Sequence, residues 1–174
     1  MAVLPIITAP DPRLKAKAKP VARVDDAVRR LMDDMLETMY LAPGIGLAAP
    51  QVGVSQRVIV VDVSKDEEKR APVVLANPEI VAKSDDLASY EEGCLSVPDH
   101  YAEVQRPAKV RVRYLDRDNE IREQEFDGLL ATVIQHEMDH LEGVLFIDHL
   151  SSLKRGMIVR KLQKVRKLKA AAAE

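Results

Sequence analysis

Apolar positions recur along the chain with two different periods, which predict helices in some regions and strands in others. In residues 25–41 they lie three and four positions apart, on one face of a helix. A second helix is predicted over 128–142, where proline is absent, Asp127 suits the N-terminal cap and Gly143 suits the position after the C-terminus. A third helix is predicted over 152–172.

The predicted strands lie between these helices. Residues 57–63 are almost entirely apolar, which indicates a buried strand. Residues 109–114 alternate charged and apolar side chains, as in a strand with one face in water, and 120–126 should pair with them as a hairpin. Residues 72–83 are expected to hold one or two strands, broken where Asn77 precedes a proline.

The order of these elements predicts the fold class. Strands and long helices follow one another without regular βαβ alternation, which is typical of an α+β protein. We expect antiparallel sheets wrapped around the central helix 128–142, with an N-terminal helix and a basic C-terminal helix. Residues 1–174 are predicted to form a single domain, as expected from the length.

Composition narrows the class of protein. Apolar residues make up 47% of the chain and charged residues 31%, which is ordinary for a globular protein. No segment approaches the roughly 18–20 consecutive apolar residues of a membrane span, and the first five residues lack the pattern of a signal peptide. A single cysteine, Cys94, cannot form an internal disulfide. We therefore expect a cytoplasmic protein without a membrane or DNA partner.

The net charge of −2 is unevenly distributed. Residues 154–174 hold eight basic side chains and one acid, a charge of +7, so the rest of the chain carries −9. A basic segment on an acidic body indicates an anionic partner. The alternative is a solvated helix that docks on the body. Its apolar stripe consists of Leu153, Met157, Ile158, Leu162, Val165 and Leu168.

The second predicted helix contains an H-E-x-x-H pattern at residues 136–140. Helical positions four apart lie on one face, roughly 5–6 Å from each other, so His136 and His140 can bind one divalent ion. Glu137 would lie beside this ion and could accept a proton from a water that the ion activates. The pattern also occurs in unrelated surface helices, but the capped, apolar context favours a metal site.

The third ligand of such a site is less obvious, because a catalytic metal usually has three protein ligands and one open position. Where some H-E-x-x-H enzymes have a third histidine, this chain has Phe146, and its only later glutamate is Glu174. His149 and His100 are conceivable ligands, although a surface imidazole is the simpler interpretation of each. Cys94 is the strongest remaining candidate, with a small buried apolar side chain as the alternative.

Three segments together resemble the three motifs of the peptide deformylase family, in order and in spacing. They are residues 44–53 (GIGLAAPQVG), 92–96 (EGCLS) and 135–140 (QHEMDH). The resemblance covers essentially the whole chain. It is specific because the three motifs occur together, whereas each of them alone is weak.

The resemblance implies a hydrolase that removes the N-formyl group from the initiator formyl-methionine of nascent polypeptides and releases formate. Glu137 would transfer the protons, while the side-chain amide of Gln51 and the backbone N–H of Leu95 would donate hydrogen bonds to the oxyanion. The implied metal ligands are Cys94, His136 and His140. The implied native metal is Fe(II), with zinc, nickel or cobalt possible in a purified sample. The implied partners are formyl-methionyl nascent peptides and, through the basic C-terminal helix, the ribosome.

The residues around the metal indicate how methionine would be held. Leu129 and Val133 share the helix face of His136 and would form an apolar wall beside the metal, with Ile45 and Gly46 across from it. The same two helix residues also suit an ordinary core. Thr132 lies on the same face.

The sequence alone does not assign a role to three further residues. Tyr101 stands where some family members have a basic residue, so contacts beyond the first substrate residue are undecided. Glu92 and Arg106 are either a supporting pair behind the metal site or an unrelated surface pair.

Two alternatives to a deformylase remain. A zinc endopeptidase would use the same H-E-x-x-H pattern, but the usual third histidine or glutamate is missing. A non-catalytic ribosome-binding module with a structural metal would need a fourth ligand and would leave Glu137 without a role.

Overall fold

An antiparallel five-stranded sheet forms the larger layer of the molecule. The computed structural model describes residues 2–173, so Met1 and Glu174, the two ends of the predicted domain, lie outside the described residues. The strand order of the sheet is β1 (Gly46–Ala48), β2 (Val58–Val61), β3 (Val73–Lys83), β6 (Lys109–Leu115) and β7 (Ile121–Asp127). A second, two-stranded antiparallel sheet consists of β4 (Leu87–Cys94) and β5 (Val97–Pro107).

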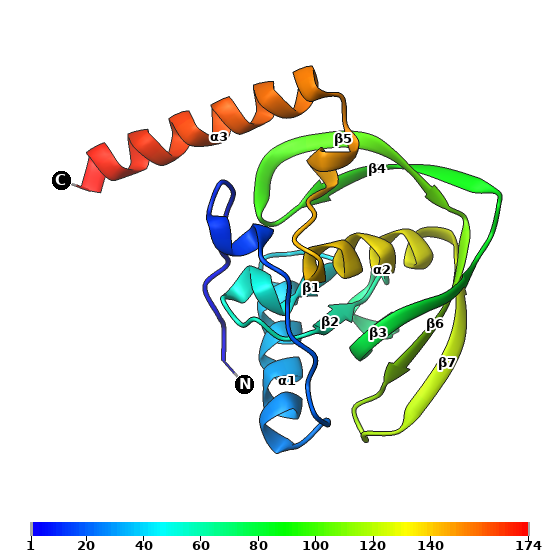
Figure 1. Cartoon of the computed structure of the whole chain (residues 1–174). Helices are drawn as coiled ribbons and strands as arrows, with labels where there is room; N and C mark the ends of the chain where they lie inside the picture. The colour runs from blue at the N-terminus through cyan, green and yellow to red at the C-terminus, as the bar shows by residue number, and fades with distance from the viewer. Residues whose placement is uncertain (1, 174) are drawn as a thin grey trace.

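Helix α2 (Gly128–Leu141) lies between the two sheets (Figure 1). Nearly all of its side chains from Ala131 to Leu141 are buried. Apolar residues pack against the sheets, and the buried polar residues gather toward the site. The predicted fold class, α+β with antiparallel sheets wrapped around this helix, is confirmed.

The other two long helices lie outside this sandwich. Helix α1 (Asp26–Leu41) packs its methionine-rich face on β1 and β2, and the Asp25 side chain caps its N-terminus by accepting a hydrogen bond from the Val28 N–H. Helix α3 (Ser152–Ala173) extends away from the body (Figure 1). Of the predicted apolar stripe on α3, only Leu162 is buried, and four members are exposed. These are Leu153, Met157, Val165 and Leu168.

The ends of α2 show how local sequence places the site. Asp127 occupies the N-cap position as predicted, but its side chain makes no capping hydrogen bond. At the other end, Gly143 has a φ of +76° and its N–H donates to the carbonyl of His140. A side chain at this position would collide with the carbonyl of Lys15, so glycine is needed both for the turn and for close packing.

The structure differs from the predicted strands in two places. Residues 73–83 form one continuous strand, because the irregularity at Asn77 is a bulge in the pairing with β6. The Asn77 side chain binds both backbone groups of Val21 and so anchors the N-terminal arm. Strands β1, β4 and β5 were not predicted. Strand β1 has only three residues, and the inward positions of β4 and β5 include the charged Glu92 and Arg106, so apolar and polar residues do not alternate along them.

The predicted 57–63 strand is observed as Val58–Val61, and the predicted hairpin as β6 and β7. Within residues 2–173, no helix is both long and apolar enough to cross a membrane.

Candidate metal centre and active site

Three potential metal ligands converge at the centre of the molecule. His136 and His140 project from one face of α2, with ring centroids 5.1 Å apart. Cys94 comes from the end of β4, where a bulge at Gly93 and Cys94 turns the strand, and its Sγ lies 3.4 Å from His140 Nε2. One ligand atom from each of the three residues lies within 4.8 Å of the others. In the part of the chain that the structure describes, they form the one such group of ligands.

The donors of this group suit a transition metal. The His136 and His140 Nε2 atoms lie 4.0 and 3.9 Å from the carboxylate oxygens of Glu137, so both face the same small volume. Glu137 Oε1 is buried and has no hydrogen-bond partner among residues 2–173. A thiolate with two imidazoles fits a soft divalent ion such as iron or zinc and leaves a coordination position for water.

The electrostatics of the two histidines agree with this arrangement. Burial, together with the nearby positive charges of His136 and Arg106, lowers the pKa of His140 well below 6.5 and favours the neutral, ligating imidazole. Burial also acts to lower the pKa of His136, but the charge of Glu137 and hydrogen bonds with Cys94 and Glu92 outweigh it and raise that pKa well above 6.5. The surroundings of His136 therefore favour a positive charge, which a bound cation would provide.

The carboxyl group of Glu137 has a pKa suited to proton transfer. Burial raises the pKa of its carboxyl from 4.5 to about 7, with the charges of Glu92 and Asp139 adding to the effect and His136 and Arg106 opposing it. A carboxyl group that titrates near neutral pH can both accept and return a proton.

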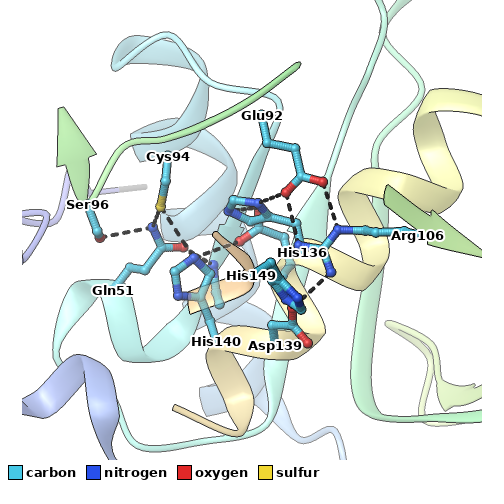
Figure 2. Close-up of polar contacts among 11 residues, drawn as sticks. Gln51, Glu92, Cys94, Ser96, Arg106, His136, Asp139, His140 and His149 are labelled. Atoms are coloured by element: carbon cyan, nitrogen blue, oxygen red, sulfur yellow. Dashed lines mark hydrogen bonds and ion pairs between the residues drawn. The ribbon is translucent and has the colours of Figure 1, made fainter. Parts of the chain in front are cut away.

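The amide of Gln51, in the turn η2 (Ala49–Val52), lies beside the potential metal ligand Cys94. Its Nε2 donates to Ser96 Oγ at 3.0 Å and toward Cys94 Sγ at 3.5 Å, while its Oε1 accepts from the Ala48 N–H at 2.9 Å (Figure 2). Ser96 was not singled out in the sequence, although it belongs to the same motif as Cys94. It orients the amide of Gln51.

The predicted pocket residues line one cavity of about 730 Å³ next to the potential metal ligands. Gly46 is essential to its shape, because a Cβ there would collide with the carboxylate of Glu137 and the side chain of Val133. Tyr101 lies at the rim, 66% exposed, with its ring against Gly93. The predicted residues in the lining are Ile45, Gly46, Gln51, Cys94, Leu95, Leu129, Thr132, Val133, His136 and Glu137.

Glu92 and Arg106 form the predicted pair behind the metal site. Arg106 Nε and Nη2 donate to the two carboxylate oxygens of Glu92 at 2.7 and 2.9 Å, and both side chains are 5% exposed. Burial raises the pKa of Glu92, but hydrogen bonds from His136 and Arg106 outweigh it, and the net pKa is below 4.5. Glu92 is therefore ionised and holds His136 Nδ1 at 2.9 Å, which directs Nε2 toward the metal position.

Two more residues extend this network. Asp139 accepts a hydrogen bond from Arg106 Nη1 at 2.8 Å, and His149 Nε2 lies 2.8 Å from the same Asp139 oxygen (Figure 2). The sequence offered no signal for this contact, because His149 lies in the separate turn η4 (Phe146–His149). Neither His149 nor His100, which lines the cavity, belongs to the group of converging ligand atoms found among the described residues.

A helix that supplies two histidines and a buried glutamate, with a cysteine from a neighbouring strand, defines a metal-dependent hydrolase of the H-E-x-x-H class. Comparisons with known proteins identify the family within this class. The model of the polypeptide deformylase family matches residues 3–156. This chain belongs to the polypeptide deformylase family.

Relatives and solved structures agree with this assignment. The chain is 63% identical over 173 residues to peptide deformylase from Methylocella silvestris, covering 98% of this chain and 88% of the relative. The peptide deformylase structure from Legionella pneumophila is 48% identical, with a TM-score of 0.88 and coverage of 97% and 98%. The structure from Ehrlichia chaffeensis in complex with actinonin is 41% identical, with a TM-score of 0.90 and coverage of 94% and 98%.

Proposed function

We propose that this protein is a hydrolase that removes the N-formyl group from the initiator formyl-methionine of nascent polypeptides and releases formate. The observation that carries the proposal is the convergence of Cys94, His136 and His140 with the carboxylate of Glu137 at the end of one cavity. Membership of the deformylase family supports the same reaction.

Cys94, His136 and His140 are proposed as the ligands of one divalent ion. When bound, such an ion supplies a Lewis acid that polarises the formyl carbonyl and lowers the pKa of a water. We assign Fe(II) as the native metal. Zinc, nickel and cobalt can occupy the same site in purified protein, because thiolate and imidazole accept all of them.

The remaining polar groups are assigned to the chemistry around the formyl carbon. Glu137 accepts the proton of the attacking water and delivers it to the departing amine. The Gln51 amide N–H and the Leu95 backbone N–H donate to the oxygen on which negative charge develops. Loss of one such donor typically slows the reaction by about 10²–10³-fold.

The methionine side chain is assigned to the apolar part of the cavity. Leu129 and Val133 form one wall, and Ile45 and Gly46 form the other. One methylene group in such a pocket contributes about 1–3 kcal/mol of discrimination. We therefore expect a preference for methionine over shorter or branched apolar side chains, such as leucine, without their exclusion.

We further propose that the enzyme acts in the cytoplasm as a single domain, attached to the ribosome through α3. The basic residues of α3 and four of its apolar side chains are exposed and free to contact a large anionic partner. Binding to RNA through lysine and arginine weakens steeply as salt increases. Cosedimentation with ribosomes should therefore fall at high salt and in an Arg160→Glu/Lys167→Glu variant.

The reaction is tested by measuring formate release from formyl-Met-Ala-Ser. Protein prepared without oxygen and loaded with Fe(II) is compared with Glu137→Ala and Cys94→Ala. We expect rapid turnover by the wild type and its loss in both variants, with metal retained in Glu137→Ala and weakly held in Cys94→Ala.

Inactivity of the wild type with iron, nickel and zinc alike would refute the proposal. Cleavage of an unformylated peptide would then favour an endopeptidase. Ribosome binding without any turnover would favour a non-catalytic module.

A further inference from the structure

A continuous chain of polar contacts connects an exposed histidine to a metal ligand. His149 Nε2 lies 2.8 Å from Asp139 Oδ2, and the same oxygen accepts from Arg106 Nη1 at 2.8 Å. The other two donors of Arg106 bind both oxygens of Glu92, which contacts His136 Nδ1 (Figure 2). The mechanism proposed above uses neither Asp139 nor His149.

The position of Asp139 matters because Arg106 is almost completely buried. The Arg106 side chain is 5% exposed, so water is a poor substitute for a missing acceptor at its Nη1 group. Asp139 is 27% exposed, and its carboxylate could otherwise turn toward solvent. His149 offers a second donor to the same oxygen and so holds the carboxylate toward Arg106.

His149 is well suited to this task because it comes from a separate element. It ends η4, whereas Asp139 belongs to α2 and Arg106 to β5. The acid next to it, Asp148, does not compete for it, since Asp148 is paired with Lys15 and Arg155. An isolated exposed ion pair contributes little, but this pair is continuous with a buried one.

We propose that His149 is a positioning residue of the metal centre. Through its hydrogen bond it holds Asp139, Asp139 holds the Arg106 guanidinium, and Arg106 fixes Glu92 against His136. The ring orientation of His136, and with it the retention of the metal, therefore depends on His149. The inference rests on the proposed function only in taking His136 as a metal ligand.

The test is the rate at which zinc- or nickel-loaded protein releases its ion to an excess of chelator. Wild type is compared with His149→Phe, which removes the donor, and with His149→Gln, whose amide N–H replaces Nε2. Mutation of a residue that directly supports a metal-bound histidine typically lowers metal affinity about 10–100-fold. The effect of His149 should be smaller, because it acts through three intervening residues. We expect release to be about 3- to 10-fold faster in His149→Phe.

Three further readouts separate positioning from a general loss of structure. His149→Gln should restore release to within about twofold of wild type. With formyl-Met-Ala-Ser, His149→Phe should lower kcat and leave KM unchanged, because His149 does not line the cavity. The control Arg155→Gln loses only a 3.8 Å pair with Asp148 and should release metal at the wild-type rate.

Equal release by wild type and His149→Phe would overturn the inference. It would also be overturned if His149→Gln were as fast as His149→Phe, because packing of the ring would then be responsible. Metal release needs no substrate, so these comparisons stand even if the protein produces no formate.

Discussion

Arg106 shows at the residue scale how this protein accommodates buried charge. Its guanidinium binds both oxygens of Glu92 and one oxygen of Asp139, so three of its N–H groups have charged acceptors. A buried ion pair of this kind often adds little to stability overall, but removing one partner is costly because the other stays buried and uncompensated. The pair therefore serves mainly to hold His136.

The cost of removing one partner of this buried pair predicts that Glu92→Gln lowers stability by an amount that depends on pH. At pH 7 the variant should lose about 3 kcal/mol of unfolding free energy, because Arg106 then lacks its main counter-charge. The pKa of Glu92 in the folded protein is below 4.5. Its stabilisation is therefore complete above pH 4.5 and is lost as the pH falls through the lower, folded-state pKa.

Urea unfolding of metal-free wild type and variant at several pH values measures this difference. We expect the gap between the two proteins to narrow below pH 4.5. Glu123→Gln is the control, because Glu123 makes exposed pairs with Arg111 and Arg113 that solvent screens. A gap that stayed constant down to pH 3 would show that ionised Glu92 is not the source of the stability.

Gly46→Ala is predicted to impair the reaction while preserving the fold. The new methyl group would displace the carboxylate of Glu137 or the side chain of Val133. A displacement of about 1 Å in a catalytic group can cost roughly 10²-fold in rate, so kcat/KM for formyl-Met-Ala-Ser should fall by about that factor. Gly156→Ala, where the new Cβ would meet only the flexible end of Arg160, should keep full activity. Wild-type kinetics in Gly46→Ala would show that this space is not required.

At the element scale, α2 both aligns two histidines along one face and supports the N-terminal arm at its C-terminal turn. Its histidines share a face because they are four residues apart, which the helix alone ensures. Its C-terminal turn also supports another segment, since the Leu141 carbonyl accepts from the Ala18 N–H and Gly143 lies against the Lys15 carbonyl. The C-terminal end of α2 is therefore anchored by the N-terminal arm.

Substitution of the two glycines at the ends of α2 measures how much the contact between Gly143 and Lys15 matters for stability. Gly128 and Gly143 both have positive φ, but a Cβ at Gly128 would meet no atom within 4 Å. Gly128→Ala should therefore incur only the conformational cost, whereas Gly143→Ala should lose more than about 1 kcal/mol beyond it through collision with Lys15. Urea denaturation gives both values. Equal losses of unfolding free energy in the two variants would mean that the N-terminal arm moves away from the new methyl group without cost.

At the scale of the whole molecule, the proposed ligands join parts that are distant in the chain. Cys94 belongs to the small sheet and both histidines belong to α2, which also packs on the large sheet. A bound ion would therefore cross-link the two layers in addition to its chemical role.

Removal of metal should consequently lower the thermal stability of the protein. An ion present at about 1,000 times its Kd stabilises the folded state by about 4 kcal/mol. Thermal unfolding with metal and with chelator should differ by several degrees in wild type and by much less in Cys94→Ala. Identical melting temperatures in wild type under both conditions would contradict the proposed ligand set.

The features that the sequence determined by itself are those that depend on neighbours along the chain. The spacing of His136 and His140, the end of α2 at Gly143, the α1 helix and the β6–β7 hairpin all follow from local periodicity and turn residues. The three motifs were also sufficient to indicate the family, because their order and spacing are specific, and the ligands proposed from them converge in the structure.

The tertiary structure decided whatever depends on residues far apart in sequence. Strands β4 and β5 alternate in burial, but their inward positions include the charged Glu92 and Arg106, so the sequence lacks the apolar alternation that predicts a strand. Ser96 beside Gln51, and His149 beside Asp139, are contacts between separate elements, and many other pairings were equally compatible with the sequence. Local periodicity specifies which face a residue occupies, but only the packed chain determines what that face meets.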